Sequence, residues 1–357
     1  MRLSHSPAGM PVVFDDQSLI ADTGVIPIIG LAQQAGLPAA VADRVHIPGD
    51  KGANPGGKVM ALVAGMLTGA DSFDDLDRLR AGGMKHVAAD VYAPSTLRQF
   101  VNRFTFGHVR ALQAACDQTL RRLAARVCLF PTRATTDPTD RMVFVDIDDS
   151  VVQVYSARKQ GAGIGYTNVR GVNMLLAVAS TTSAPPVIVA NRLRKGNANS
   201  ARGAKKMVED ALAHVKRLPG TRGKQLVLAA DSAYYNTDVA WAGLKAGADI
   251  SITIRMTPVV KKAIEAISDD AWKAIRYPNA VWDDHTREWI SEAEVAETSY
   301  TAFATVPGKA ITTRLVVRRI PEKNQTKLAK AGQDGLFKVW RYHGFVTTIS
   351  PDILNTV

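Results

Sequence analysis

Two apolar runs each end at an aspartate, and these aspartates have the clearest capacity for chemistry. Asp148 follows the run that begins at Met142, and Asp231 follows the run that begins at Leu226. A carboxylate at the end of a buried strand is costly unless a cation compensates it, and hard divalent cations prefer carboxylate oxygens. Two such strand ends side by side predict a Mg²⁺ or Mn²⁺ site.

Such a site is suited to phosphodiester chemistry. Two metal ions about 4 Å apart, held by three carboxylates, activate a water or a 3′-hydroxyl and stabilise the leaving oxygen. Strand alternation places Asp146 and Asp148 on one face of the first strand and Asp149 on the other. The alternative is that Asp148 and Asp231 only cap turns by accepting backbone N–H groups.

Positive charge is concentrated between these aspartates. The chain of 357 residues carries 44 Lys and Arg against 33 Asp and Glu, a formal net charge of +11. Residues 1–140 are nearly neutral, whereas residues 158–224 hold 13 basic residues and only two acids, Glu209 and Asp210. Such a tract attracts polyanions and gains affinity for nucleic acid by releasing counterions from phosphates. We expect nucleic acid as the partner; a solvated basic face without a ligand is the alternative.

Composition excludes several classes of protein. Hydrophobic residues make up 46% of the chain and charged residues 22%, which is typical of a globular protein. No apolar run approaches the roughly 18 residues of a membrane span, and no apolar segment after Met1 has the form of a signal peptide. We therefore expect a cytoplasmic protein with no membrane partner. The spacing of Cys116 and Cys128 fits neither a zinc site nor a disulfide framework, so we expect buried thiols.

Residues 1–135 are predicted to form a mostly helical domain that binds DNA. Apolar side chains recur at helical spacing in four segments: Ile20–Leu37, Lys58–Leu67, Ser72–Arg80 and Ser95–Leu123. A short helix, a Gly-containing break and a second helix bearing Arg98 and Arg103 would form a helix-turn-helix unit that enters a major groove. A plain helical bundle with exposed arginines is the alternative. The Pro- and Thr-rich segment Pro131–Pro138 is typical of a linker.

A mixed α/β domain is predicted from residue 141 onward. Its core is expected to comprise residues 141–257 and 336–357, interrupted by an insertion at 258–335. Ser350–Asp352 has the form of a helix start. Strands are expected at Met142–Val145, Val172–Ala179, Pro186–Ala190, Gln225–Ala230, Asp249–Ile254, Thr312–Ile320 and Lys338–Thr348, and helices at Ser200–Leu218 and Asn236–Ala246.

Several segments, taken together and in order, resemble the DDE-domain transposases of bacterial insertion sequences. The resemblance covers nearly the whole chain. It implies an α/β fold with an RNase H-like mixed sheet and a β-rich insertion, preceded by a mostly helical domain. It also implies Mg²⁺- or Mn²⁺-dependent cleavage at the element's ends, joining of the freed 3′-hydroxyl to target DNA, and a homodimer on DNA. The matching segments are Val145–Ser150, the Gly-rich Gln160–Tyr166 and Leu228–Tyr235, with Pro94–Leu97 and Phe104–His108 in the N-terminal part.

The resemblance assigns roles to the aspartates. It implies that Asp148 is the first catalytic acid, with Asp146 as the alternative, and that Asp231 is the second. The family's third acid is a glutamate on the helix after the last core strand, and here we expect it beyond Val357. The hypothesis that follows is a C-terminally truncated copy that binds DNA but transfers strands poorly.

Other residues are expected to contact the DNA. Trp282 or Trp289 in the insertion would support a flipped base, with burial in the core as the alternative. Basic residues are expected to contact phosphates, which positions the DNA without reading its sequence. The candidates are Arg158, Lys159, Arg170, Arg192, Arg194, Lys195, Arg202, Lys205, Lys206, Arg98 and Arg103.

Two other functions stay open. Asp146 and Asp148 also fit the loop of a haloacid-dehalogenase-like phosphatase, with Asp146 as nucleophile and Asp148 as general acid and base. Against this, Asp231 and Asp238 have the wrong spacing for that family's second acid pair. The other alternative is a DNA-binding transposase remnant without catalysis.

Overall fold

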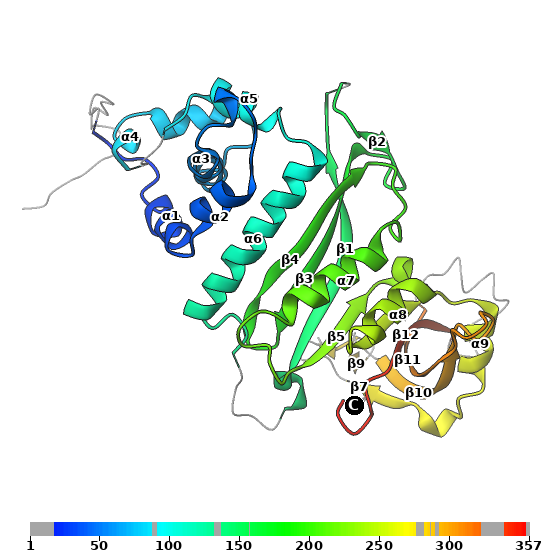
Figure 1. Ribbon diagram of the computed structural model, residues 1–357. Helices are drawn as coiled ribbons and strands as arrows, with labels where there is room; N and C mark the ends of the chain where they lie inside the picture. Colours follow the sequence, from blue (N-terminus) through cyan, green and yellow to red (C-terminus); the bar gives the residue numbers. More distant parts are fainter. Residues whose placement is uncertain are drawn as a thin grey trace, which may run out of the picture. The chain divides into compact units, whose positions relative to one another are not determined.

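The described residues divide into two compact units. The computed structural model describes residues 18–87, 91–131, 137–156, 158–275, 282–285, 287–289, 293–322 and 339–354. The boundary between the units lies between Val127 and Cys128. The first unit contains α1 (Val25–Gln34), α2 (Leu37–Arg44), α3 (Pro55–Leu67), α4 (Met84–Val87), α5 (Pro94–Val101) and α6 (Phe106–Arg126), with 3₁₀ helices at Asp50–Gly52 and Asp74–Arg80 (Figure 1).

Two breaks between helices fall in segments that were expected to be helical, one near the end of Ile20–Leu37 and the other inside Ser95–Leu123. The chain turns between α1 and α2 at Gly36, whose φ of 76° is a left-handed conformation that glycine adopts without strain. Among the described residues no single helix is long and apolar enough to cross a membrane, although α1 and α2, bent by 55°, pass that test as a pair. The second break separates α5 from α6, which starts after Thr105 with a capping box completed by His108.

The prediction that both cysteines are buried is wrong. Cys116 and Cys128 are exposed free thiols. Cys116 follows Ala115, which is fully buried in the core of the first unit with Val41 and Phe100. Since successive side chains on a helix are about 100° apart, Cys116 lies away from that core.

The second unit is built on one ten-stranded sheet. Its strands lie in the order β2-β3-β1-β5-β6-β12-β11-β10-β7. β4 also pairs with β3, along the edge of β3 that faces away from β1. β8 (Trp282–Asp283) and β9 (Glu288–Trp289) form a separate two-stranded sheet. The ten strands are β1 (Met142–Gln153), β2 (Gly163–Ile164), β3 (Arg170–Thr181), β4 (Ala184–Lys195), β5 (Gln225–Ala230), β6 (Asp249–Ile254), β7 (Lys273–Ile275), β10 (Ala293–Ala302), β11 (Ile311–Pro321) and β12 (Trp340–Thr347).

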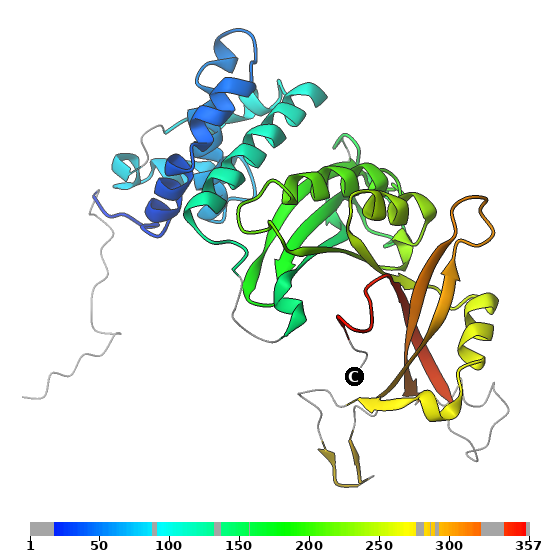
Figure 2. The ribbon, with the colours of Figure 1, turned by 60° about the horizontal axis from the view of Figure 1, so that its bottom comes forward.

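The first five long strands form the predicted RNase H-like sheet. β1 pairs antiparallel with β3 and parallel with β5, and β5 pairs parallel with β6. α7 (Ala204–Val215) and α8 (Thr237–Lys245) connect these strands and lie on one face of the sheet (Figure 2). Apolar residues at helical spacing on α7, including Met207, Ala211 and Leu212, are fully buried against the strands. The α/β fold class with a helical N-terminal region is therefore confirmed.

Strands from residues 258–335 extend this same sheet. α9 (Pro258–Glu265) precedes them. β10 and β11 pair with each other, β11 pairs with β12, and β12 pairs antiparallel with β6. Hydrogen bonding thus runs without a break from the RNase H-like strands into the added β-strands.

The first strand is longer than its apolar run predicted. β1 continues to Gln153 because its polar second half pairs with β3, ending at the partner Gly171. Asp148 therefore lies inside β1, and the expectation that it ends the strand is wrong. Asp231 does directly follow β5, as predicted.

The C-terminal described residues lie on the face of the sheet opposite α7 and α8 (Figure 2). Ile349 packs against Met142 and Val227. Strand alternation puts Met142 on the same face as Asp146 and Asp148. The helix that was expected to start at Ser350–Asp352 is not formed within the described residues, where residues 350–354 form a turn. In this turn Ser350 Oγ accepts a hydrogen bond from the backbone N–H of Asp352 at 3.3 Å.

Candidate active site

The pairing of β1 and β5 brings Asp148 and Asp231 together. The parallel register of the two strands ends at Ile147 opposite Ala230. The residue that follows Ile147 is Asp148, and the residue that follows Ala230 is Asp231. Neighbouring strands lie about 4.8 Å apart, and residues in register point to the same face. Both aspartates are exposed. The two carboxylates therefore open to solvent next to each other.

Each of these carboxylates has one oxygen held by the backbone. Asp148 Oδ1 accepts from the N–H of the next residue at 2.7 Å, and Asp231 Oδ1 accepts from the N–H of Ala233 at 2.9 Å. These are the contacts expected if Asp148 and Asp231 only cap turns, so that alternative describes one oxygen of each carboxylate. They leave the second oxygen of each carboxylate without a partner among the described residues. A divalent cation suits two such oxygens.

A complete set of metal ligands is not found in the described part of the chain. No group of three His, Cys, Asp or Glu side chains there lies close enough together to hold a metal ion. The pair of Asp148 and Asp231 is a partial ligand set.

Asp146 lies two residues before Asp148 on the same face of β1. Its carboxylate accepts a long hydrogen bond of 3.5 Å from Ser180 Oγ. Burial raises the pKa of Asp146, and the contact with Ser180 opposes that rise only in part. Asp146 is exposed, like Asp148, and lies about 6.6 Å further from the turn after β5 at the usual rise of a strand.

Asp149 lies on the opposite face of β1, as alternation predicted, and is buried. Its side chain is 3% exposed. Burial alone would raise the pKa of Asp149, but the hydrogen bonds donated to it, led by that of Tyr234, lower the pKa below its usual value. Its four side-chain partners are Tyr234 (Oη to Oδ1, 2.7 Å), Arg194 (Nη2 to Oδ2, 3.3 Å), Asn173 and Ser200.

Arg194, which was expected to contact DNA, is also buried. Its side chain is 7% exposed and ion-paired with Asp149. A guanidinium with this many partners inside the protein is not free to bind a phosphate, so its burial argues against the predicted contact. It donates hydrogen bonds to Asn173 Oδ1 (2.8 Å) and to the carbonyl oxygens of Asn199 (3.2 Å), Ser200 (2.9 Å) and Arg202 (2.7 Å).

Tyr166 is an aromatic side chain near the carboxylates that the sequence reasoning did not single out. It is 70% exposed. Desolvation and then the charges of Asp149, Asp148 and Asp231 raise the pKa of its hydroxyl. The neighbouring Gly165 packs tightly, because a Cβ there would lie 2.7 Å from a carbonyl oxygen of the loop after β4. The sequence signal that could have identified Tyr166 is its position at the end of the Gly-rich segment Gln160–Tyr166.

Most of the other basic residues predicted at DNA are open to solvent. Arg170 and Arg192 are half-buried. Arg192 lies 3.3 Å from Asp210, and Lys206 lies 2.9 Å from the same carboxylate. Such solvent-accessible ion pairs are weak, so they leave these cations available to a stronger anion. The exposed members are Arg158, Lys159, Lys195, Arg202, Lys205 and Lys206.

The two arginines of the first unit differ in their surroundings. Arg98, on α5, lies 2.9 Å from Asp74 and over the ring of Phe73 at 5.5 Å. Arg103 is exposed in the turn between α5 and α6. The expectation of one helix that carries both arginines is therefore wrong, since α5 ends at Val101. A role of either arginine in reading DNA stays a prediction.

Trp282 is not a core side chain. It lies on β8, is 45% exposed and pairs in register with Trp289 on β9. The side chain of Trp289 lies outside the described residues. Burial in the core, the alternative considered for both, is therefore wrong for Trp282.

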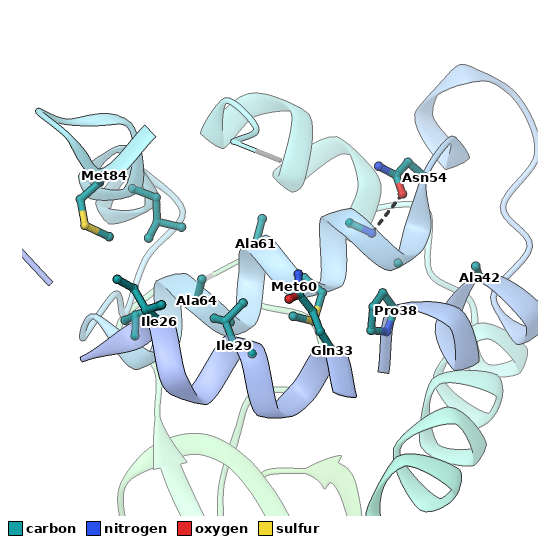
Figure 3. A pocket seen from close by; sticks show the side chains of 15 residues that line it. Ile26, Ile29, Gln33, Pro38, Ala42, Asn54, Met60, Ala61, Ala64 and Met84 are labelled. Atoms are coloured by element: carbon teal, nitrogen blue, oxygen red, sulfur yellow. Dashed lines mark hydrogen bonds between the residues drawn. The ribbon is translucent and has the colours of Figure 1, made fainter. Parts of the chain in front are cut away.

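The first unit contains an apolar cavity that has no acidic or basic side chain in its lining. It has a volume of about 430 Å³ and lies among α1, α2 and α3 (Figure 3). Ile26, Ile29 and Met60 contribute to its lining, and no lining residue is titratable. The candidate chemistry is therefore at the carboxylates of the second unit.

Comparison with protein families identifies the chain. Residues 6–329 match the family described as Transposase DDE domain group 1. No curated protein matches the chain. The match spans both units and includes Asp148 and Asp231. Membership implies transposition, a DNA partner and, in general, the use of divalent metals. The protein belongs to the group 1 family of DDE-domain transposases.

Proposed function

We propose that this protein cleaves DNA at the ends of an insertion sequence and joins the freed 3′-hydroxyl to target DNA, with Asp148 and Asp231 holding Mg²⁺ or Mn²⁺. The observation that carries the proposal is the register of β1 and β5, which puts these aspartates side by side. Asp146 is the alternative first ligand, on the same face of β1.

The chain's own residues prepare this site before any metal binds. The backbone N–H groups at Asp149 and Ala233 each fix one carboxylate oxygen of the pair. The fixed orientation leaves the second oxygen of each carboxylate directed away from the backbone contact and free to coordinate. A bound divalent metal would supply activation of a water or 3′-hydroxyl and stabilisation of the leaving oxygen.

The basic side chains around the site suit a DNA backbone. We place Arg158, Lys159, Lys195, Arg202 and Lys205 on the DNA surface, because their charged ends are exposed. Lys206, Arg192 and Arg170 are further members, with Arg98 and Arg103 in the helical domain. The domain scheme that we propose is a DNA-binding domain over residues 1–135, core residues 141–257 and 336–357, and an insertion at 258–335. A homodimer on DNA completes the proposal.

The phosphatase alternative has less support. It requires a loop in which Asp146 attacks phosphorus and Asp148 transfers a proton. Residues 146–151 instead lie inside β1, paired with β3. A DNA-binding remnant without catalysis remains the outcome to be tested.

Metal-dependent nicking tests the proposal. The substrate is a supercoiled plasmid that carries the reading frame with its flanking DNA, which would include the element's ends. We expect nicking by the full chain in Mg²⁺ or Mn²⁺ and none in EDTA. Asp148→Asn and Asp231→Asn should each slow it by about 10³-fold, because a metal that stabilises the transition state contributes several kcal/mol.

A matched control is Asp270→Asn, which removes a carboxylate from the same unit outside the proposed site. We expect this variant to nick at the wild-type rate. Salt-dependent DNA binding by a folded wild-type chain that nicks nothing in either metal would instead establish a binder. Unchanged nicking in both site variants would place the chemistry elsewhere.

A further inference from the structure

A buried hydrogen-bond network lies directly behind the two exposed aspartates. Its centre is the carboxylate of Asp149, the residue after Asp148 on β1. Asp149 accepts from Tyr234 Oη at 2.7 Å, and its side chain is 3% exposed. Since Asp148 and Asp149 are consecutive on one strand, fixing the buried carboxylate also fixes the backbone that carries the exposed one.

Tyr234 makes the same connection on the other side of the site. It lies in the short 3₁₀ turn Ser232–Tyr234 that begins directly after Asp231. Its backbone N–H donates to the carbonyl oxygen of Asp231 at 3.1 Å. Tyr234 is fully buried. The position of Asp231 is therefore tied to the position of the Tyr234 ring.

Arg194 anchors this network to the rest of the unit. Its guanidinium lies 3.3 Å from Asp149 and bridges to Asn173 on β3. It also binds carbonyl oxygens of residues 199, 200 and 202, in the loop that leads into α7. The side chain of Asp149 thus has a rigid cationic partner, and the only link from it to the turn after β5 among its described partners is the Tyr234 hydroxyl.

We propose that Tyr234 and Asp149 are positioning residues that fix the separation of Asp148 and Asp231. The contact spans the two chain segments that carry these acids, one residue beyond Asp148 and three residues beyond Asp231. In this role it would limit how far the two exposed carboxylates can move apart before an ion binds between them. This inference rests on the proposed metal site.

Removal of a single hydroxyl tests the role. Tyr234→Phe keeps the buried ring and deletes only the donor to Asp149. We expect the affinity of the full chain for Mn²⁺ to fall about tenfold or more, as it does when a partner of a metal ligand is lost. Free Mn²⁺ is measured by electron paramagnetic resonance during a titration, and the melting temperature is recorded for each variant.

The next residue supplies a matched control. Tyr235 stacks on Phe303 at a centroid distance of 4.7 Å, and its hydroxyl interacts with Tyr300 rather than with Asp149. Tyr235→Phe also deletes a hydroxyl from a half-buried tyrosine of the same segment. We expect it to change the melting temperature by a similar amount and to leave Mn²⁺ affinity unchanged. A purely structural role for Tyr234 would make the two variants alike in both measurements.

The outcomes separate this inference from the function on which it rests. If the wild-type chain binds Mn²⁺ and Asp148→Asn abolishes that binding, the metal site is supported. If the wild-type chain binds no Mn²⁺, or binds it equally well after Asp148→Asn, the site and the inference fail together. If that site is present and Tyr234→Phe binds Mn²⁺ as tightly as wild type, only the positioning role fails. Asp149→Asn should weaken Mn²⁺ binding in the same direction, because it removes the charge that holds Arg194 in place.

Discussion

Consecutive residues on one strand have opposite surroundings in this protein. Asp148 is exposed beside Asp231, whereas Asp149 is buried and ion-paired with Arg194. The same contrast occurs on β4, where Arg194 is buried and Lys195 is exposed. The cause is the twofold alternation of a strand that is covered by helices on one face only. Charge alone therefore does not tell which residues serve structure and which meet a ligand.

Arg194 and Lys195 provide a prediction at this scale. Arg194→Met leaves the Asp149 carboxylate buried without its cation, which should lower the free energy of unfolding by about 3–5 kcal/mol. Lys195→Met should change it by no more than about 0.5 kcal/mol. The same Lys195 variant should weaken DNA binding at all sequences and reduce the salt slope by about 1. Urea unfolding and binding at several salt concentrations measure these effects.

Each half of this prediction fails separately. Equal stability of the two variants would show that Arg194 is not the required counter-ion of Asp149. An unchanged salt slope for Lys195→Met would remove that lysine from the DNA surface.

At the scale of elements, the strands that sequence patterns predicted best are the parallel ones at the centre. Gln225–Ala230 and Asp249–Ile254 match β5 and β6. β5 is an almost continuous apolar run, as is typical of a central parallel strand. β6 instead alternates three buried isoleucines with polar residues, which is the pattern of a strand with one buried face. β1, β3 and β4 were predicted too short. The residues missed at the ends of β1 and β4 are mostly polar and lack a clear strand pattern. They are strands because they pair with β3, which no local pattern contains.

The candidate site shows the same division. Asp231 directly after β5 was predictable from the end of an apolar run, and Asp149 on the second face of β1 from alternation. The contact of Asp149 with Tyr234 was not, because it joins residues 85 positions apart. The burial of Arg194 was not predictable since β4 was expected to end at Ala190, and only a strand continuing to Lys195 places Arg194 on the buried face.

The strands that extend the sheet are stabilised by an arginine between two tryptophans. The guanidinium of Arg319, on β11, lies 4.2 Å from the ring centroid of Trp272 and 4.4 Å from that of Trp340. Its side chain is 13% exposed and pairs with Glu294 on β10. This stacking requires a planar cation, which lysine lacks.

Arg319→Lys should therefore lower the free energy of unfolding by about 1–2 kcal/mol, through loss of stacking at constant charge. Arg341→Lys, an exposed change on β12 of the same sheet, should cost no more than about 0.5 kcal/mol. Chemical denaturation followed by tryptophan fluorescence compares the two. Equal costs would mean that the tryptophan contacts contribute nothing specific.

At the scale of the whole molecule, charge and fold point to the same partner. Residues 1–140 are nearly neutral, whereas the remainder carries 30 basic residues against 20 acids. The second unit therefore combines the excess positive charge with the paired aspartates on an RNase H-like sheet. Membership in the transposase family implies a DNA partner, which agrees with this excess of positive charge.

Exchange of a metal ligand tests the central claim most directly. Asp231→Cys replaces a hard carboxylate ligand with a soft thiolate, which binds Mg²⁺ poorly and accepts softer ions such as Cd²⁺ or Zn²⁺. The account predicts that this variant and Asp148→Cys lose plasmid nicking in Mg²⁺ and recover part of it in the softer ions. Recovery with wild-type stability would identify both side chains as metal ligands. Folded variants that nick as wild type in Mg²⁺, or that fail with every metal while the wild type is active, would contradict it.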